Sequence, residues 1–274
     1  VDDRGVMVSL DKPAQRVVCL YGALTDLFAA MDRRDLLKAR TAADDHEELA
    51  KLPSVGTHMR PSVEMVLSVQ PDLVLQMGRR EAVLKPVARL EELGLSVAVF
   101  QPDSLADLYL VFERIGVLTG TEQEARDLAD GMRERIKLVA DRLVHIPDQA
   151  RPRVFFEIRY PNLLAAGTGS MVDEVIRLAG GVNCVATDQR LVRLGEEMLL
   201  GLSPGFYLIQ TGPMNPAPTP LDERPLFKGL AALHSGRVSV VEESVFSRPG
   251  PNLARAVEDL AALLHPELFV RDTN

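Results

Sequence analysis

Short apolar, β-branched runs alternate with longer segments of helical period along the chain. In the first half these runs predict strands near residues 16–20, 73–76 and 96–100. Apolar positions spaced by three and four predict helices near residues 24–31, 62–69 and 83–93. This alternation is typical of parallel sheets covered by helices, so we expect an α/β fold.

A long amphipathic segment follows this first series. Thr121 and Glu124, three residues apart, form a capping box that predicts the start of a helix. Apolar residues then continue on one face from Ala125 to Leu143, which corresponds to a helix of about six turns. Pro147 follows the end of this helix, so the best boundary between two lobes lies there.

A second α/β series begins after the proline-bracketed stretch. The pattern predicts strands near residues 153–158, 207–210 and 237–241, a helix from Ser170 to Ala179, and a last helix near residues 252–264. We therefore expect an N-terminal α/β lobe at 1–118, a connecting helix at 119–147 and a C-terminal α/β lobe at 148–274.

The two halves echo each other at one place. The segments Val66–Leu75 and Leu199–Ile209 both read as the end of a helix, a proline turn and a buried strand. This echo favours two similarly built lobes over one continuous sheet.

Charge and cysteine content narrow the function classes. The formal net charge is −8, with acidic and basic residues mixed along the chain, and there is no basic stripe to follow a phosphate backbone, so we expect no nucleic-acid partner. No apolar run reaches the roughly 20 residues that a membrane-spanning helix requires. Cys19 and Cys184 fall in different lobes and are expected to be separate buried thiols. The first ten residues lack the features of a secretion signal, so we expect any such signal to have been removed before Val1.

Several motifs occur in a specific order. The first half contains Leu-Pro-Ser-Val-Gly, Pro-Ser-Val-Glu and Pro-Asp-Leu-Val-Leu, and the second contains Gly-Thr-Gly-Ser, Leu-Ala-Gly-Gly-Val-Asn and Ser-Arg-Pro-Gly-Pro-Asn. The motifs lie at 52–56, 61–64, 71–75, 167–170, 178–183 and 247–252. With them, the sequence from about residue 16 to residue 268 resembles the periplasmic binding proteins of the iron-siderophore, haem and cobalamin type.

This resemblance implies both a fold and a function. It implies two Rossmann-like lobes joined by a single long hinge helix, with a ligand cleft between the lobes. The protein would be the extracytoplasmic solute-binding subunit of an ABC importer and would deliver a ferric siderophore, corrinoid or haem to the permease. It implies a monomer without catalytic activity or intrinsic cofactor, whose ligand is an iron or cobalt chelate. The location would be periplasmic, or lipid-anchored on the outer side of the cytoplasmic membrane.

Candidate ligand residues are those that follow strands, because ligands of open α/β sheets collect at the carboxyl ends of strands. The planar N–H donors of an arginine guanidinium suit carboxylate and phosphate groups. Several arginines at positions that follow strands therefore indicate an anionic ligand. Arg79, Arg80 and Arg190 fit equally well as solvated surface charges. In proteins that the chain resembles, the segment that contains Arg248 lines the cleft. The predicted ligand residues are Tyr21, His58 and Arg60 in the first lobe, and Arg159, Tyr160, Arg193 and Arg248 in the second.

Histidines suggest one candidate metal ligand. The haem-binding relatives place an axial tyrosine in the loop after Val-Gly, where this chain has Thr57 and His58. His58 is therefore the candidate metal ligand, with a loop histidine that only forms hydrogen bonds as the alternative. Tyr160 in the second lobe keeps the haem hypothesis open. His46 lacks a histidine four residues on, because position 50 is Ala50, so we expect a solvated acidic turn there.

The sequence also predicts roles for Ser170 and for two glutamates. Ser170 is expected to cap a helix after a tight turn rather than to cradle a nucleotide, because the turn lacks the remaining residues of either phosphate-binding motif. Relatives of this type present one exposed glutamate on each lobe to the permease, and Glu81 and Glu197 match by position. Glutamate in a first helical turn also has a simpler explanation, since it favours the helix dipole.

Alternative functions remain open from sequence alone. A molybdate-like oxyanion would suit the arginines, and the absence of Trp, with four Tyr and nine Phe, gives a large macrocycle few stacking partners. A cytoplasmic chelatase-like enzyme would share the two Rossmann-like lobes.

Overall fold

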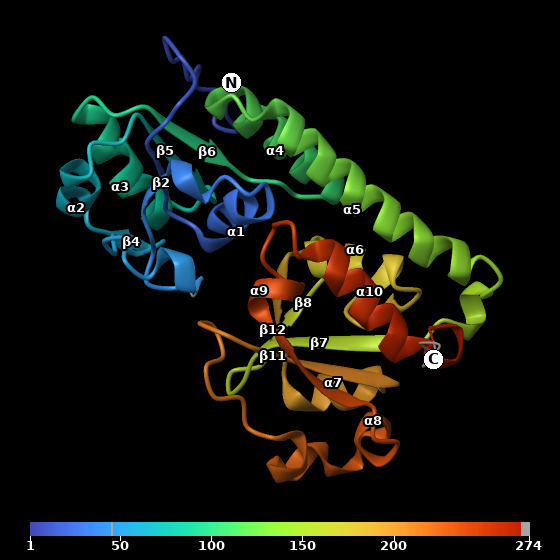
Figure 1. Cartoon of the computed structure of the whole chain (residues 1–274). Helices are drawn as coiled ribbons and strands as arrows, with labels where there is room; N and C mark the ends of the chain where they lie inside the picture. The colour runs from blue at the N-terminus through green and yellow to red at the C-terminus, as the bar shows by residue number, and fades with distance from the viewer. Residues whose placement is uncertain (45, 270–274) are drawn as a thin grey trace. The chain divides into compact units, whose positions relative to one another are not determined.

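The protein forms two compact units (Figure 1), and the computed structural model describes residues 1–44 and 46–269. Unit 1 comprises Val1–Pro102 and Ala106–Asp130, and unit 2 comprises Asp103–Leu105 and Gly131–Asn274. The predicted amphipathic segment is a single helix, α5 (Glu122–Leu143), with residues in both units. Its role as a hinge stays a prediction. Among the described residues, no helix is both long and apolar enough to span a membrane.

Unit 1 contains a parallel sheet in the order β2-β1-β5-β6. The strands are β1 (Val17–Cys19), β2 (Leu37–Ala39), β5 (Leu73–Met77) and β6 (Val97–Phe100), and every residue of β1, β5 and β6 is buried. Continuous burial is typical of a parallel sheet covered on both faces. Helices α2 (Val63–Ser68) and α3 (Glu81–Glu92) cover one face, and α1 (Gly22–Ala30) and α4 (Leu105–Thr119) lie on the other (Figure 1).

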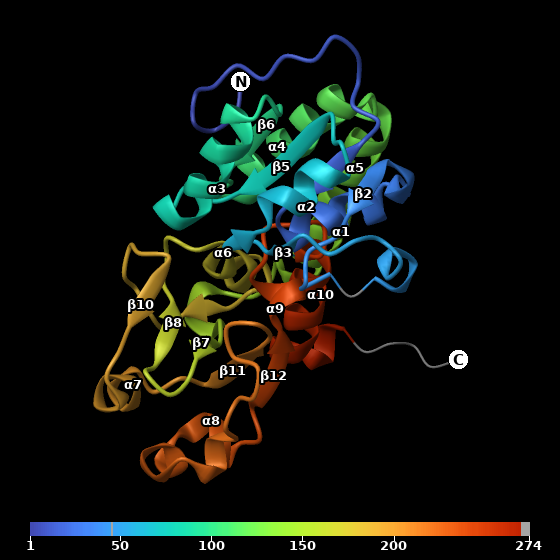
Figure 2. The ribbon, with the colours of Figure 1, turned by 90° about the vertical axis from the view of Figure 1, so that its left-hand side faces the viewer.

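Unit 2 contains a mixed sheet in the order β10-β8-β7-β11-β12, with β9 paired to β7. β7 (Arg153–Arg159), β11 (Phe206–Thr211) and β12 (Val238–Glu242) are parallel, as is β9 (Val182–Asn183) to β7. β8 (Leu164–Ala166) and β10 (Leu191–Arg193) run antiparallel and form the side seen at the left of Figure 2. β8 and β10 were not predicted, and neither were β2 and β9, because each has only two or three residues. β1 is equally short but was predicted from the longer apolar run around it.

Helices cover both faces of the unit 2 sheet. α6 (Met171–Leu178), α9 (Glu243–Phe246) and α10 (Leu253–Leu264) lie on one side, and α7 (Glu196–Leu202) and α8 (Ala231–His234) on the other (Figures 1 and 2). Side chains alternate across β7. Phe155 packs with the α7 and α8 side, whereas Phe156 contacts Phe246 of α9 with ring centroids 6.4 Å apart.

Short elements complete the chain. They are the hairpin β3 (Gly56–Thr57) and β4 (Arg60–Pro61) and the 3-10 turns Arg34–Leu36, Glu47–Leu49, Asp148–Ala150, Leu221–Glu223, Pro225–Gly229 and Pro266–Leu268.

The echo predicted between the halves recurs in backbone geometry. After α2, Gln70 adopts a left-handed conformation (φ 46°) immediately before Pro71 and β5, and after α7, Ser203 does the same (φ 45°) before Pro204 and β11. Both units therefore use the same sharp connection from a helix to a buried strand.

The core of unit 2 contains a charged pair. Glu157 of β7 and Arg224 form two hydrogen bonds, and their side chains are 0% and 1% exposed. Arg224 also donates to the carbonyl oxygen of Thr219 at 2.6 Å, and the Tyr207 hydroxyl donates to Glu157 at 2.6 Å. Burial and the Glu157 carboxylate raise the pKa of Tyr207 well above its usual range, so this hydroxyl remains a donor.

Replacing the cation of this pair should destabilise unit 2 strongly. Arg224→Ala leaves the Glu157 carboxylate buried and removes its cation, while the Tyr207 hydroxyl still donates to it. This change should cost about 3–5 kcal/mol of unfolding free energy. Arg255→Ala is the matched control, because Arg255 pairs with Asp259 on the surface of α10 and should cost less than about 1 kcal/mol. Equilibrium denaturation measures both. Equal, small losses would mean that the Glu157–Arg224 pair does not hold the core together.

Candidate functional site

In unit 1 the structure brings together two predicted ligand residues from distant segments. Tyr21 follows β1 directly as the N-cap residue of α1, and its ring meets the His58 ring edge-on, with centroids 5.3 Å apart and planes at 84°. The side-chain amide of Gln76, at the carboxyl end of β5, donates to the carbonyl oxygen of His58 at 3.2 Å. Tyr21 and His58 thus lie beside the carboxyl ends of the central strands, where the sequence placed them.

Arg60 belongs to the same hairpin as His58. Gly56 has φ +92°, and a Cβ atom there would lie 2.8 Å from the Arg60 carbonyl oxygen, so the hairpin requires glycine at this position. The backbone N–H of Arg60 donates to the Thr57 hydroxyl at 3.2 Å. The hairpin therefore fixes the backbone of Arg60 and leaves the residue exposed.

His46 is paired, which corrects the expectation of a solvated turn. Its Nε2 lies 2.8 Å from a carboxylate oxygen of Asp26 on α1, and the two side chains are 26% and 15% exposed. Asp44 accepts a hydrogen bond from the Thr41 N–H at 2.6 Å. The turn is held against α1 because Asp26 is a hydrogen-bond partner that lies 20 residues away.

Both cysteines are buried free thiols, as predicted. Burial, followed by the carboxylates of Asp44 and Asp26, raises the pKa of Cys19 well above its usual range. Burial raises the pKa of Cys184 to about 11. Both groups remain neutral thiols near pH 7 and are poor nucleophiles there.

In unit 2, Tyr160 follows β7 and is fixed on several sides. Its hydroxyl donates to a Glu196 carboxylate oxygen on α7 at 2.9 Å. The Arg224 guanidinium lies 4.0 Å from the centre of its ring, and the Phe227 ring lies edge-on at 5.8 Å. The hydrogen bond to Glu196, followed by burial, raises the pKa of Tyr160, so the side chain is a neutral phenol near pH 7.

The two arginines nearest β7 and β8 differ in environment. Arg159 is the last residue of β7, and its Nε is buried without a hydrogen-bond partner in the part of the chain that the structure describes. Arg193 ends the edge strand β10, where its Cα pairs with that of Leu164, and it is exposed. Arg159 therefore has an unused donor at a strand end, whereas Arg193 is solvated.

Arg248 lies in a polar cluster near the carboxyl end of β11. Gln210 of β11 is completely buried, accepts from the Ser247 hydroxyl and donates to Glu243 at 3.2 Å. Glu243 also accepts from the Met214 N–H at 3.1 Å. The Arg248 Nε lies 3.6 Å from the other Glu243 oxygen, and its side chain is 12% exposed. Arg248 is thus held by a loose ion pair near the carboxyl end of β11, where ligand residues are predicted.

The sequence analysis missed several residues that position the predicted ligand residues. Gln76 and Gln210 directly follow the two echoed segments, so extending the echo by one residue would have found them. Glu157 is an acid within the apolar run of β7, which is itself a signal for a buried partner. Arg224, as that partner, gives no local signal because it lies 67 residues away in a loop.

Glu81, Glu197 and Ser170 are the remaining residues with predicted roles. Glu81 and Glu197 lie in the first turns of α3 and α7, and both are exposed. Ser170 caps α6 as expected, accepting from the Asp173 N–H at 3.3 Å and donating to the Gly167 carbonyl oxygen at 2.7 Å. No group of three or more His, Cys, Asp or Glu side chains suited to a metal ion occurs among the described residues.

Comparisons with known proteins agree with the resemblance. The model of the periplasmic binding protein family matches residues 17–244. An uncharacterised ABC transporter substrate-binding lipoprotein of Bacillus subtilis is 26% identical over 96% of this chain and 83% of its own. A cobalamin-binding protein of Halobacterium salinarum is 25% identical over 96% of this chain and 73% of its own.

Among solved structures, a periplasmic haem-binding protein from Pseudomonas aeruginosa superimposes with a TM-score of 0.80 at 24% identity. The match covers 92% of this chain and 93% of that one, and it shows the shared fold. The predicted two-lobed α/β class is confirmed, and so is the expectation of a binding protein rather than an enzyme. The family match covers most of both compact units, and the chain belongs to the periplasmic binding protein family of ABC importers.

Proposed function

We propose that this periplasmic binding protein captures a metal chelate with anionic groups and delivers it to the permease of an ABC importer. The observation that carries the proposal is the family match over residues 17–244. A relative named as cobalamin-binding, 25% identical over 96% of the chain, supports a chelate as the ligand. The name of the Bacillus subtilis relative supports an extracytoplasmic location, for which we propose the periplasm or a lipid anchor on the outer side of the cytoplasmic membrane.

The arginines support an anionic ligand. Among the described residues, Arg159 offers a buried Nε without a hydrogen-bond partner, and Arg248 makes a loose ion pair with Glu243 at 3.6 Å. A carboxylate or phosphate of the ligand would supply the acceptor that Arg159 lacks and would form a shorter contact with Arg248. Arg60 and Arg193, both exposed, would attract the ligand at longer range.

Tyr160 and His58 keep haem among the candidate chelates. The Tyr160 hydroxyl donates to Glu196, a carboxylate that would accept its proton if a haem iron bound the phenolate. His58, the candidate metal ligand, contacts Tyr21 edge-on. A corrinoid or ferric siderophore, in which the chelator already supplies the ligands of the metal, is the other candidate. The cleft between the lobes remains a prediction, as does a monomer that binds one ligand.

Removing Arg248 should weaken ligand binding without unfolding unit 2. Glu243 keeps its hydrogen bonds from Gln210 and Met214 when Arg248→Ala is made, so the melting temperature should fall by less than about 2 °C. Loss of one charged contact should weaken binding about 10- to 100-fold. Equilibrium titration with cyanocobalamin, a ferric hydroxamate siderophore, haemin and molybdate measures the affinities, and the bound probe should saturate at one per chain.

Arg255→Ala serves as the control in this titration, because it removes an exposed arginine of the same unit from a surface pair. It should leave the affinity unchanged. Unchanged affinity in Arg248→Ala would exclude Arg248 from the site, and tight binding of molybdate alone would replace the chelate by an oxyanion.

The exposed glutamates at the starts of α3 and α7 should serve docking to the permease. Reversing both, as Glu81→Arg with Glu197→Arg, places like charges against permease arginines and should abolish stimulation of the transporter ATPase in vesicles while ligand affinity stays intact. Glu92→Arg with Glu134→Arg, also an exposed glutamate from each unit, is the control and should stimulate normally. Full stimulation by the first pair would remove Glu81 and Glu197 from the docking surface.

A further inference from the structure

One edge of the unit 1 sheet is a strand with an open side. β6 is last in the order β2-β1-β5-β6. The carbonyl oxygens of Ser96 and Phe100 accept from the Val74 and Gly78 N–H groups on the β5 side, both at close to 2.9 Å. Because backbone groups alternate along a strand, those of Val97, Val99 and Gln101 face the open side.

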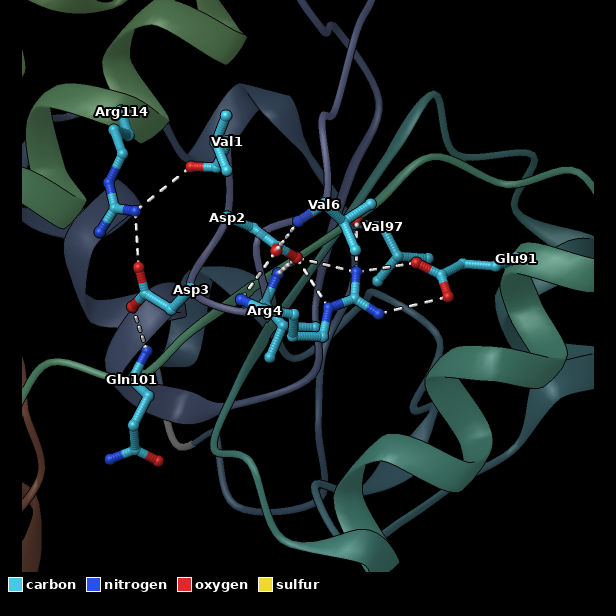
Figure 3. Close-up of polar contacts among 10 residues, drawn as sticks. Val1, Asp2, Asp3, Arg4, Val6, Glu91, Val97, Gln101 and Arg114 are labelled. Atoms are coloured by element: carbon cyan, nitrogen blue, oxygen red, sulfur yellow. Dashed lines mark hydrogen bonds and ion pairs between the residues drawn. The ribbon is translucent and has the colours of Figure 1, made fainter.

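The N-terminal segment Val1–Val6 covers these open groups, as Figure 3 shows. The Asp3 N–H donates to the Val99 carbonyl oxygen at 3.0 Å, and the Val99 N–H donates to the Asp2 carboxylate at 3.0 Å. The Gln101 N–H donates to the Asp3 carboxylate at 2.6 Å, and Arg4 donates to the Val97 carbonyl oxygen at 3.3 Å. Side chains thus provide most of the bonds that a neighbouring strand would provide.

Asp2 holds this segment in a tight turn. Its carboxylate accepts from the backbone N–H groups of Arg4 at 2.9 Å and Val6 at 3.1 Å, and from the Arg4 Nε at 2.8 Å. Asp2 is only 5% exposed. A carboxylate buried to this extent is stabilised by such donors.

Two ion pairs fasten the turn to neighbouring helices. The Arg4 guanidinium contacts both carboxylate oxygens of Glu91 on α3, at 2.8 and 3.2 Å. Arg114 of α4 donates to the Asp3 carboxylate at 2.6 Å and to the Val1 carbonyl oxygen at 3.3 Å (Figure 3). The segment is therefore anchored on both sides of β6.

We propose that Val1–Val6 is an edge strap, which completes the unit 1 sheet and prevents β6 from pairing with the β6 strand of a second copy. An uncovered edge strand presents unpaired N–H and C=O groups and is a ready template for another chain. The strap occupies the β6 positions that such a strand would use. Residues 3–5 of the strap form a turn and a bend rather than a strand, so the strap offers no continuing ladder.

Acid should release the strap. Burial alone would raise the pKa of Asp2, but hydrogen bonds from Val99, Arg4 and Val6 lower it overall below its ordinary value of 3.8. The charged groups around it are Arg4 in the strap, Glu91 on α3, and Glu113 and Arg114 on α4. A carboxylate with a lowered folded-state pKa stabilises above its unfolded pKa, and that contribution is lost as pH falls through the folded value. Strap stability should therefore be full at neutral pH and decline below about pH 4.

Residue-resolved hydrogen exchange of the full chain tests the proposal. Asp2→Ala with Asp3→Ala should speed exchange of the Val99 and Gln101 amides at least about tenfold, because both lose their acceptors. The Ala98 and Phe100 amides, on the β5 side, should exchange at the original rate. Light scattering at rising protein concentration should show self-association of the double variant.

Glu91→Gln provides a milder second variant that leaves the acceptors of β6 in place but removes the anchor of Arg4. Glu92→Gln is its matched control, since Glu92 is the next residue of α3 and pairs with Arg89 on the surface. Glu91→Gln should speed Val99 exchange and Glu92→Gln should not. Unchanged exchange of Val99 and Gln101 in both strap variants would overturn the strap, and faster exchange without self-association would overturn its protective role.

Discussion

Most polar groups that are buried near strand ends are paired, and this constraint positions the candidate site in both units; the Arg159 Nε is an exception among the described residues. The Glu157 carboxylate forms an ion pair with Arg224, and the Arg224 guanidinium lies against the Tyr160 ring. Gln76 binds the His58 carbonyl oxygen, and Gln210 binds Glu243 and Ser247 beside Arg248. Leaving any of these groups unpaired would cost on the order of 1–3 kcal/mol, and more for the charges. The loops that carry the predicted ligand residues are therefore held by the core.

The same constraint accounts for the contacts of residues 1–6. The backbone groups on the open side of β6 would be unpaired, and the strap supplies Asp2, Asp3 and Arg4 as their partners. Within a sheet, neighbouring strands pair most backbone N–H and C=O groups. At the edge strand and at strand ends these groups lack a neighbouring strand, so side chains must pair with them there. Structural and candidate functional polar residues consequently gather at the margins of both sheets.

Sequence periodicity predicted the long elements well. Helix α5 and the buried strands β5 and β11 have enough residues to show a period. Tyr21 and Tyr160 lie just after β1 and β7, as expected, and their role in ligand binding stays a prediction. Sequence periodicity did not predict β8 and β10, which are too short. It also did not predict the side chains that pair with residues near the predicted ligand positions. Arg224, in particular, is determined by a contact across 67 residues, which no local pattern encodes.

Relatives at 25–26% identity establish the family of the chain and not its ligand, so the ligand is the part of the account that a direct measurement should decide. The most direct test is mass spectrometry, with absorption spectra, of small molecules retained by the protein after native purification from its own host. The account predicts one metal chelate that carries carboxylate or phosphate groups, at up to one molecule per chain. A bare oxyanion, or an organic compound without a metal, would contradict it.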